Sequence, residues 1–564
     1  MDLNHDTIEE DWLRSPNLAP ARVQELASEM LRADEARMKA LHARMVRVKR
    51  IHNSAALINA RLPLEVLVEV FRLAGPLTSS KDAIRLTHVC HAWRTLIHGT
   101  PAFWTDFVFP PPGHLLVGST RRNHLSVVLD ALARTAPMRI TFGLCGDYLP
   151  VLNTPAAESH LSRISALYLD CRGEEDGDMR PFFDLSLLSL ESLELRVKCD
   201  DASLPADIAA ESPARFPRLR ILRTTCTGFP LAWVGPSLKV LDVLAGLEEA
   251  VTPRQARRVR CCYPSSLSEL FLVLERCPGL EVLGFFGCLP HDPAPIAQSS
   301  SPRLDHLETV RIWDDADCVR MFLERFTLPR DAFVTICTDS AYDALSEFLP
   351  AANRLQAIPL IEQIELSVCR PAEVRFYYPH IVQGYALEAC GESRTRLAVL
   401  SSDQFFLHPA ADLDLLRLFR GFAPIFSPAA IFDLDVTLCR PVRDGQSEAW
   451  AWVLGYFPKI THLSVEAASS RDVFLALSQE NVAPGLSHLY VILNGAQDWV
   501  AEYEEMVSVL ELRAARALRP EFLLYRQQVK GEEDEIPPPV PVSYVERLQV
   551  VVGRVMVPLP CCVD

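Results

Sequence analysis

The side chains in this sequence that could best bind a metal ion or react are those of two acidic clusters and sixteen scattered cysteines. Residues 173–178, GEEDGD, and the pair Asp314-Asp315 offer carboxylate oxygens to a cation, but neither follows the ligand order of an EF-hand loop. No Cys-x-x-Cys pair occurs, which removes the commonest zinc and redox signatures. We therefore expect solvated acidic loops and reduced thiols, with no metal site and no cofactor.

Catalytic motifs are also missing from the sequence. There is no Walker P-loop, no G-x-G-x-x-G, no G-x-S-x-G and no H-E-x-x-H, and the fifteen histidines do not cluster. Cys561 stands four residues from the end, as prenylation requires, but Asp564 is a poor last residue for that signal. The sequence predicts no catalytic residue and a protein that is not an enzyme. An enzyme with an unrecognised site is the open alternative.

Composition and charge narrow the class of protein further. A net charge of −16 argues against nucleic-acid binding, which needs a basic surface, whereas 49% hydrophobic residues suffice for a sizeable core. No apolar run of 18 residues is present, so we expect no membrane span. The acidic N-terminus does not resemble a signal peptide. We therefore expect a cytoplasmic or nuclear protein, or one found in both compartments.

The first secondary-structure element that the sequence predicts is a long helix. Residues 1–20 are polar and are expected to be loose, whereas residues 21–58 contain no glycine or proline and predict one helix. Met38, Leu41, Met45 and Val48 recur at spacings of 3 and 4. This spacing fits a short coiled coil that would make a homodimer through residues 21–58. It equally fits a helix packed on its own chain, and both readings stay open.

Residues 59–108 predict a small helical module with too much apolar surface to bury alone. The first helix follows Pro63 and is apolar on two faces, one with Leu64, Leu67, Val68 and Phe71 and the other with Val66 and Val70. A second helix is predicted from Ser79–Asp82 to Gly99. Aromatic residues follow at Phe103, Trp104 and Phe107. One face can pack on its own module, and the other needs a partner.

The order and spacing of residues in this module resemble the F-box. The resemblance rests on Leu62-Pro63-x-Glu65-Val66-Leu67-x-x-Val70-Phe71, then Asp82, then Val89-Cys90-x-x-Trp93-Arg94, then Phe103-Trp104. The stretch from Ala74 to Thr78 departs from the pattern and lengthens the loop between the helices. The helix that runs into Ile58-Asn59 and Leu62-Pro63 is also similar to the F-box-like proteins of mushroom-forming fungi.

The resemblance implies a partner and a set of contact residues. In that family the module binds a Skp-type adaptor, which links it to a cullin scaffold and a RING ubiquitin ligase. Carried over by position, the adaptor interface or its support would consist of Leu62, Pro63, Leu67, Val70, Phe71, Val89, Cys90, Trp93 and Trp104.

Residues 109–530 repeat three apolar positions at spacings of 3 and then 2. The triplets are Ile164/Leu167/Leu169, Leu190/Leu193/Leu195, Leu219/Leu222, Leu238/Leu241/Val243, Leu280/Leu283/Phe285, Leu307/Val310/Ile312, Ile361/Ile364/Leu366, Ile431/Leu434/Val436, Ile460/Leu463/Val465, Leu486/Leu489/Val491 and, beyond that range, Val545/Leu548/Val550. Many middle positions are 26 to 29 residues apart, and the ninth position is Cys288, Cys369, Cys439 or Asn494 in four units. This spacing, with Cys or Asn at the ninth position, resembles the sequence pattern of leucine-rich repeats. An ordinary α/β domain with coincident leucines is the alternative.

The predicted fold is therefore an α+β or α/β repeat protein. A long helix and the F-box precede an irregular leucine-rich-repeat solenoid whose parallel sheet lines a concave face. Residues 531–542 would form an acidic and proline-rich loop, and residues 543–564 a final strand and tail. The expected function is substrate recognition in a Skp–cullin–F-box ubiquitin ligase, with the repeats binding the target protein. The alternative is a protein-binding scaffold outside ligase complexes.

Overall fold

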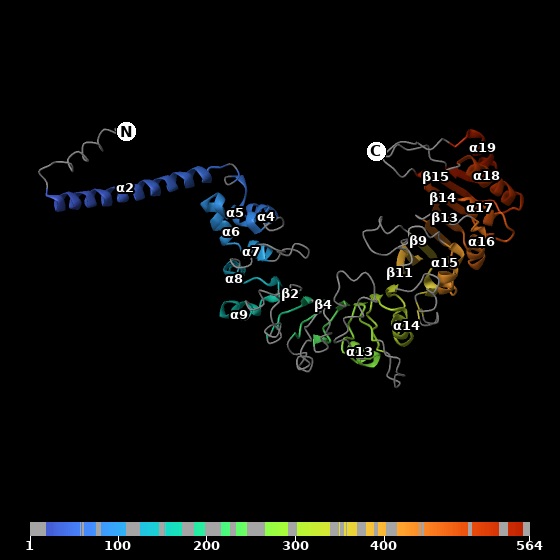
Figure 1. The fold of residues 1–564 in the computed structure, drawn as a ribbon, viewed down its shortest axis with the longest axis horizontal. Coiled ribbons are helices and arrows are strands. Elements are labelled where there is room, and N and C mark those ends of the chain that lie inside the picture. The colour runs from blue at the N-terminus through green and yellow to red at the C-terminus, as the bar shows by residue number, and fades with distance from the viewer. Residues whose placement is uncertain are drawn as a thin grey trace. The chain divides into compact units, whose positions relative to one another are not determined.

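The computed structural model of the chain divides into two compact units (Figure 1). Unit 1 comprises Met1–Gly143 and Thr154–Arg163, and unit 2 comprises Leu144–Asn153 and Ile164–Asp564. The described residues are 19–56, 61–74, 80–108, 125–145, 154–171, 187–197, 216–225, 233–244, 266–290, 302–338, 358–368, 380–387, 393–401, 414–438, 445–494, 499–528 and 540–556, with the single residues 58, 152, 185, 349, 355, 356 and 442.

The described part of unit 1 contains the predicted long helix, α2 (Pro20–Ser54). Pro20 occupies the first turn, where a missing N–H leaves no hydrogen bond unmade. The helix ends at Ser54, earlier than the predicted residue 58, and Ala55 closes it by donating its N–H to the carbonyl of Ile51. The prediction of a loose segment at residues 1–20 falls almost wholly outside the described residues.

Four short helices follow in the predicted module: α4 (Leu64–Ala74), α5 (Ser80–Val89), α6 (His91–His98) and α7 (Pro101–Val108). The prediction of a single second helix was wrong, because the chain breaks at Cys90. This residue has extended backbone angles and caps α6. Gly99 ends α6 as predicted, with its N–H donated to the carbonyl of Thr95. The predicted cap at Ser79–Asp82 includes residues outside the description.

Arg163 links the described segments of unit 1 that follow the module. Helices α8 (Leu125–Arg134) and α9 (Pro155–Leu161) flank the start of strand β1 (Ile140–Cys145). The guanidinium of Arg163 donates to the carbonyls of Leu132 and Met138, and the carbonyl of Arg163 accepts the N–H of Ile140 at 2.9 Å. These bonds tie the loop after α8 to the end of α9.

Unit 2 is built on a largely parallel sheet. Its strands are β2 (Ile164–Cys171), β3 (Ser192–Val197), β4 (Ile221–Thr225), β5 (Val240–Leu244), β6 (Val282–Phe286), β7 (Thr309–Trp313), β8 (Phe333–Thr338), β9 (Gln363–Val368), β10 (His380–Leu387), β11 (Ser393–Ser401), β12 (Asp433–Leu438), β13 (His462–Ala467), β14 (His488–Asn494), β15 (Phe522–Gln528) and β16 (Arg554–Met556). They follow chain order except that β11 and β10 stand between β8 and β9. Strand β10 is antiparallel to both of its neighbours.

The predicted apolar triplets form the core side of this sheet. Their middle residues pair in register, Leu193 with Leu222, Leu283 with Val310, and Leu463 with Leu489. All six of these side chains are fully buried. In parallel strands the in-register residues share a face, so a column of aliphatic side chains runs across the strands on each side of β10. Ten of the eleven predicted triplets lie at or just before a strand of this sheet.

Helices cover the core side of the sheet (Figure 1). They are α13 (Leu267–Leu274), α14 (Ala316–Arg325), α15 (Leu415–Phe422), α16 (Ser447–Tyr456), α17 (Arg471–Leu477), α18 (Trp499–Ala515) and α19 (Val542–Val551), with single turns of 3-10 helix at Ile358–Leu360 and Ala423–Phe426. Two of these helices, α13 and α17, come directly before β6 and β14 in the chain. Cys288, the ninth residue of its predicted unit, is buried and donates its thiol hydrogen to the carbonyl of Val243 at 3.4 Å.

The eleventh triplet was assigned wrongly, because Val545, Leu548 and Val550 lie in helix α19. Helical periodicity buries Leu548 and Val551 there and leaves Val550 73% exposed, whereas a strand would have buried Leu548 and Val550 together. The final strand is β16. The loop predicted at 531–542 falls mostly outside the described residues. No helix in the described part of the chain is long and apolar enough to span a bilayer.

Candidate functional site

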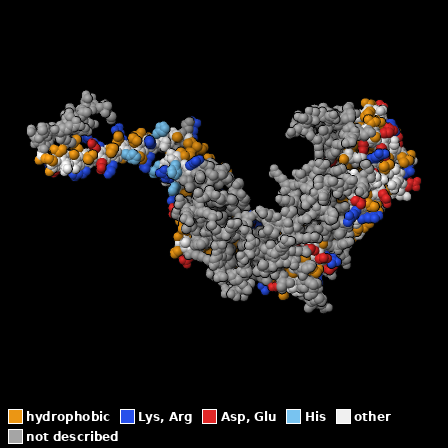
Figure 2. All heavy atoms as spheres, in the orientation of Figure 1, with side chains coloured by type: hydrophobic (Ala, Val, Ile, Leu, Met, Phe, Trp, Pro, Cys, Tyr) orange, Lys and Arg blue, Asp and Glu red, His pale blue; other side chains and the backbone are white. Residues whose placement is uncertain are grey.

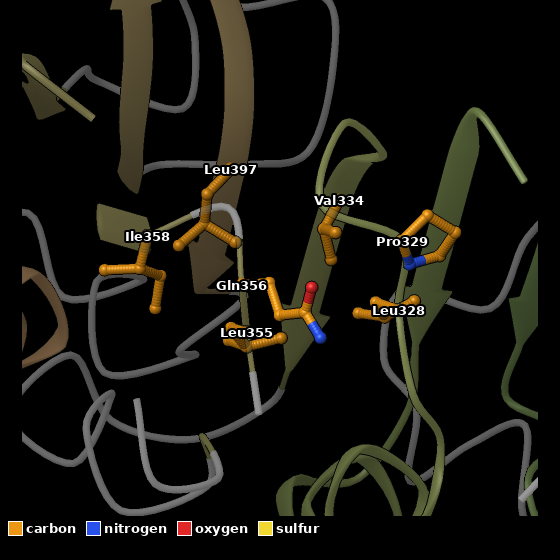
Figure 3. Close-up of a pocket in the computed structure, with 7 residues that line it drawn as sticks. All are labelled: Leu328, Pro329, Val334, Leu355, Gln356, Ile358 and Leu397. Carbon is orange, nitrogen blue, oxygen red and sulfur yellow. The ribbon is translucent and has the colours of Figure 1, made fainter. Parts of the chain in front are cut away.

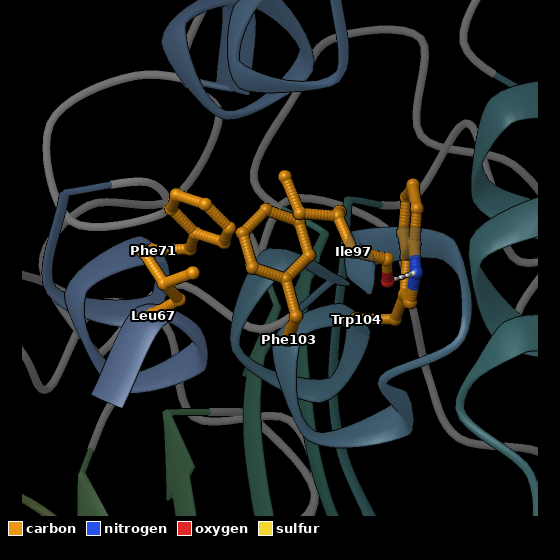
Figure 4. Packing of buried hydrophobic residues seen from close by; sticks show 5 residues of the cluster. All are labelled: Leu67, Phe71, Ile97, Phe103 and Trp104. Carbon is orange, nitrogen blue, oxygen red and sulfur yellow. Dashed lines mark hydrogen bonds between the residues drawn. The ribbon is translucent and has the colours of Figure 1, made fainter. Parts of the chain in front are cut away.

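The helical module of unit 1 has a small but tightly closed core (Figure 4). Leu67 and Phe71 of α4 meet Ile97 of α6 and two aromatic residues of α7, and all five are at most 7% exposed. The aromatic residues are Phe103 and Trp104, whose rings meet edge to face at 5.6 Å. Only one face of α4 is used by this core.

The break between α5 and α6 has a defined geometry. The buried sulfur of Cys90 accepts the backbone N–H of Trp93 at 3.4 Å, which caps α6. The Trp93 ring then packs against Phe71 in a tilted arrangement, with 4.6 Å between the ring centroids. Arg94 reaches back across the break and donates from Nε to the carbonyl of Thr87 at 2.9 Å. The motif Cys90-x-x-Trp93-Arg94 therefore fixes the angle between the two helices and their distance from α4.

Trp104 is held from the inside of unit 1. Its indole Nε1 donates to the carbonyl of Ile97 at 2.8 Å, and the guanidinium of Arg134 lies over its ring at 5.2 Å. Arg134 also contacts Nδ1 of His98 at 2.6 Å. Burial, and then the charges of Arg134 and Arg94, lower the pKa of His98, which favours the neutral ring as an acceptor. Trp104 thus supports the module and does not face outward.

The outward side of α4 is apolar and uncovered. Val66, Val70 and Leu73 recur at helical spacing and are 44%, 39% and 67% exposed. We call these three residues the outer face of α4. Pro63 and Leu64 extend exposed apolar surface at the start of the helix. A helix that is apolar on two sides, with one side covered by its own module, has the form expected of an interface.

The nine residues predicted from sequence divide into three groups. Leu67, Phe71, Cys90 and Trp104 are buried and support the module. Leu62 and Trp93 are half-buried at the edge of the core. Pro63, Val70 and Val89 are exposed, Val89 to 56%, and are available for direct contact. The prediction left out Leu64, Val66 and Leu73. The spacing of Val66 and Leu73 from Val70 is the signal that identifies two of them.

Charged residues border the outer face of α4. Glu65 and Glu69 are exposed on an adjacent side of the helix, and Glu69 pairs with Arg72 at 3.1 Å. An exposed pair of this kind contributes little to stability. The apolar face is thus rimmed by charge on the same helix, as protein interfaces often are.

The outward face of the sheet in unit 2 has a different character. Side chains that alternate with the buried column are mainly polar, including Glu194 and Arg196, which pair at 3.0 Å. On the later strands His462 stacks on His488 at 4.3 Å. Burial, together with the nearby charges of Glu365, Asp433 and Glu466, raises the pKa of Asp435 to about 6. This face is suited to polar and charged contacts.

The described residues of unit 2 line hollows of very different size. An open one of about 520 Å³ is bordered by Arg471 of α17 and by Glu504, Glu505 and Ser508 of α18. A much smaller one, between β8 and β11, has a volume of about 10 Å³ and is lined almost wholly by apolar side chains such as Val334 and Leu397, with Gln356 as the polar one (Figure 3). That is roughly room for one water molecule. Within the described ranges no group of His, Cys, Asp and Glu could hold a metal ion.

Comparison with known families agrees with this arrangement of helices. Residues 59–110 match the family model described as F-box-like. No match was found among the curated proteins. The match spans α4 to α7 and includes the outer face of α4, and F-box domains generally bind Skp-type adaptors. The chain therefore carries an F-box-like domain at residues 59–110.

Proposed function

We propose that this protein is the substrate-recognition subunit of a Skp–cullin–F-box type ubiquitin ligase. Its F-box-like domain binds the Skp-type adaptor, and the adaptor links it to a cullin and RING ligase. The observation that carries the proposal is the outer face of α4, where Val66, Val70 and Leu73 are exposed on a helix that places Leu67 and Phe71 in the core of the module.

The contact residues follow from their exposure. Pro63, Val70 and Val89 touch the adaptor directly, with Leu64, Val66 and Leu73 beside them. Leu62 and Trp93 contribute the edges that they expose. Leu67, Phe71, Cys90 and Trp104 act indirectly, because they hold α4, α6 and α7 in place. Burial of several exposed aliphatic side chains supplies the affinity.

We further propose that unit 2 is an irregular leucine-rich-repeat domain that binds the target protein. Three features support this: parallel strands in near-sequential order, an aliphatic column in register, and the buried Cys288 after β6. The outward sheet face would be the concave binding surface. Its polar and charged side chains suit recognition of one target over others.

In this proposal the chain performs no chemistry itself, needs no cofactor and works in the cytoplasm or the nucleus. It brings a target near a ubiquitin-transfer machine that other subunits supply. Self-association through α2, the remaining predicted contact, is a separate proposal. The same folded parts would also suit a scaffold outside ligase complexes, and reconstitution distinguishes the two functions.

The test is assembly and activity of the reconstituted ligase. The full chain is mixed with a Skp-type adaptor, and the mixture is then mixed with a cullin and RING pair. We expect co-elution in both steps and ubiquitin transfer to proteins captured by the chain. Co-elution with the adaptor but not with the cullin would favour the scaffold. No adaptor binding at all would overturn the proposal.

A matched pair of variants makes the reconstitution specific. Val89→Glu places a charge on an exposed contact residue and should remove the adaptor from the complex. Val550→Glu places the same charge on the exposed side of α19, in unit 2, and should leave assembly unchanged. Equal loss in both variants would indicate a general effect of charge and would contradict the assigned interface.

A further inference from the structure

Helix α2 carries an apolar stripe that the described parts of the chain leave exposed. Met38, Leu41, Met45 and Val48 follow one another at spacings of 3 and 4 and are 47–65% exposed. Figure 2 shows hydrophobic side chains interleaved with Lys and Arg along this helix. Val23, Ala27 and Met30 continue the stripe in the first half of the helix. This regular spacing is typical of one strand of a coiled coil.

The two halves of α2 carry opposite charge. Residues 20–35 hold four acidic side chains and two arginines, whereas residues 36–54 hold six Lys and Arg and no acidic side chain. A helix of 35 residues can therefore present an acidic half and a basic half to the same partner. Charge of this kind decides which partner, and which orientation, the stripe accepts.

A parallel pair of α2 helices would bring like charges together. Asp34 lies on the stripe, seven residues before Leu41, so a parallel pair would place the two Asp34 side chains in one layer. Arg44 and Lys49 flank the stripe on opposite sides, five residues apart, the offset at which flanking residues meet in a parallel coiled coil. The basic halves would repel each other along their whole length.

An antiparallel pair removes both conflicts. When Asp34 of one helix faces Leu41 of the other, it lies between the other helix's Arg37 and Arg44. In the same register Met30 faces Met45, and Ala27 faces Val48, so the C-terminal end of the stripe on each helix meets apolar residues of the other. Within one chain Asp34 pairs with its own Arg37 at 3.4 Å, and both side chains are more than 60% exposed. Pairing therefore adds a second cation to Asp34.

We propose that α2 binds α2 of a second copy of this chain in antiparallel orientation, with the acidic half of each helix against the basic half of the other. The proposal does not depend on adaptor binding, because it uses no residue of the F-box-like domain. It assigns a partner to the stripe and gives the assembled protein two adaptor-binding modules and two target-binding surfaces.

The first test is the mass of the full chain in solution. Sedimentation equilibrium over a concentration series should show a reversible dimer that added salt weakens, because screening reduces attraction between exposed charges. The variant Leu41→Glu with Met45→Glu keeps good helix formers in α2 and should be monomeric throughout. A wild-type chain that stays monomeric, or a dimer that survives these changes, would overturn the proposal.

Orientation is tested by reversing one charge. Arg44→Glu should weaken an antiparallel dimer about tenfold, because each Asp34 then meets a carboxylate. The same change would tighten a parallel dimer, because the new carboxylate at position 44 would meet Lys49. Exchange of the pair, Asp34→Arg with Arg44→Asp, should restore most of the lost affinity. Arg47→Glu is the matched control, since Arg47 points away from the stripe and its reversal should change the dissociation constant less than about twofold.

Binding of the basic half to an anionic surface is the competing explanation of its charge. Co-sedimentation with phosphatidylserine vesicles, with phosphatidylcholine vesicles as reference, tests it on the same preparations. We expect no more binding to the anionic vesicles than to the reference. A monomer that binds the anionic vesicles and loses this binding in Arg47→Glu as well as Arg44→Glu would contradict the proposal.

Discussion

Helix α4 and strand β13 are both rich in aliphatic side chains, but they distribute them differently. In β13, Leu463 and Val465 are at most 1% exposed, and the residues that alternate with them, His462, Ser464 and Glu466, are polar. In α4, Leu67 and Phe71 are equally well buried, yet Val66 and Val70 on the far side are 44% and 39% exposed. The strand has one apolar face and the chain covers it. The helix has two, and the described chain covers one.

The difference indicates two kinds of binding surface. A constant partner can be bound through an exposed apolar face, since burial of that face is always favourable. A selective partner is better recognised by polar and charged groups, because mismatched pairs are costly. On this view α4 is the general contact of the molecule, and the outward face of the sheet is the specific one.

The sharpest way to separate the two faces of α4 is a pair of neighbouring substitutions. Phe71→Ala should cost about 3–5 kcal/mol of module stability, because it leaves a cavity beside Trp93 and Leu67. Val70→Ala, one residue away but exposed, should cost less than about 0.5 kcal/mol. Hydrogen exchange of α4 to α7 in the full chain measures both. Similar loss of protection in the two variants would show that α4 has no free face.

A matched pair of substitutions on β13 makes the same comparison in unit 2. Leu463→Ala removes a buried member of the aliphatic column and should cost about 2–5 kcal/mol. Ser464→Ala, the next residue on the outward face, should have a far smaller effect. Denaturant unfolding followed by hydrogen exchange in β12 to β14 reports the difference. If both changes were mild, the column would not be the core of this sheet.

Much of this architecture could be predicted because it follows from local periodicity. The spacing of 3 and then 2 located ten strands, since each strand must place alternate residues on one buried face. The same rule failed at Val545–Val550, where three apolar residues fit a strand and a helix equally, and Pro541 at the helix start carried the better signal. Strands β8 and β15 were not assigned in advance.

The order of the strands in the sheet could not be predicted from the spacing of apolar residues. The step of 54 residues from Val310 to Ile364 indicates a missing unit, and Val334 of β8 does pair with Val310. Nothing local shows that β10 and β11 insert between β8 and β9, because that order depends on contacts between distant segments. At the site, motif position identified the residues, but only burial separates those that contact a partner from those that support them.

Asp435, on the outward face of the sheet, should have a smaller effect on stability, and one that depends on pH. Burial first, and then neighbouring acidic groups, raise the pKa of Asp435 to about 6 from an ordinary value of 3.8. The folded state therefore holds a proton between about pH 4 and 6 that the unfolded state has lost, so this group lowers stability as pH rises through that range. Asp435→Asn should be more stable than the wild type by about 1–2 kcal/mol at pH 8.

The gain in Asp435→Asn should shrink as pH falls through about 6 and vanish near about pH 4. Denaturant midpoints at several pH values measure it, with Asp305→Asn as a control at an aspartate whose side chain is 76% exposed. A gain that is constant with pH would mean that the substitution acts by packing or hydrogen bonding and not by removing a strained charge.

The central claim is that the outer face of α4 binds a Skp-type adaptor, and a calorimetric titration tests it most directly. The adaptor is titrated into the full chain, into Val66→Glu with Val70→Glu, and into Glu65→Gln with Glu69→Gln, which changes the adjacent charged side of the same helix. We expect the first variant to bind at least about 100-fold more weakly, because two buried carboxylates would lack partners, and the second to bind within about threefold of the wild type. Unchanged affinity in the Val66 and Val70 variant, with its hydrogen exchange intact, would contradict the account.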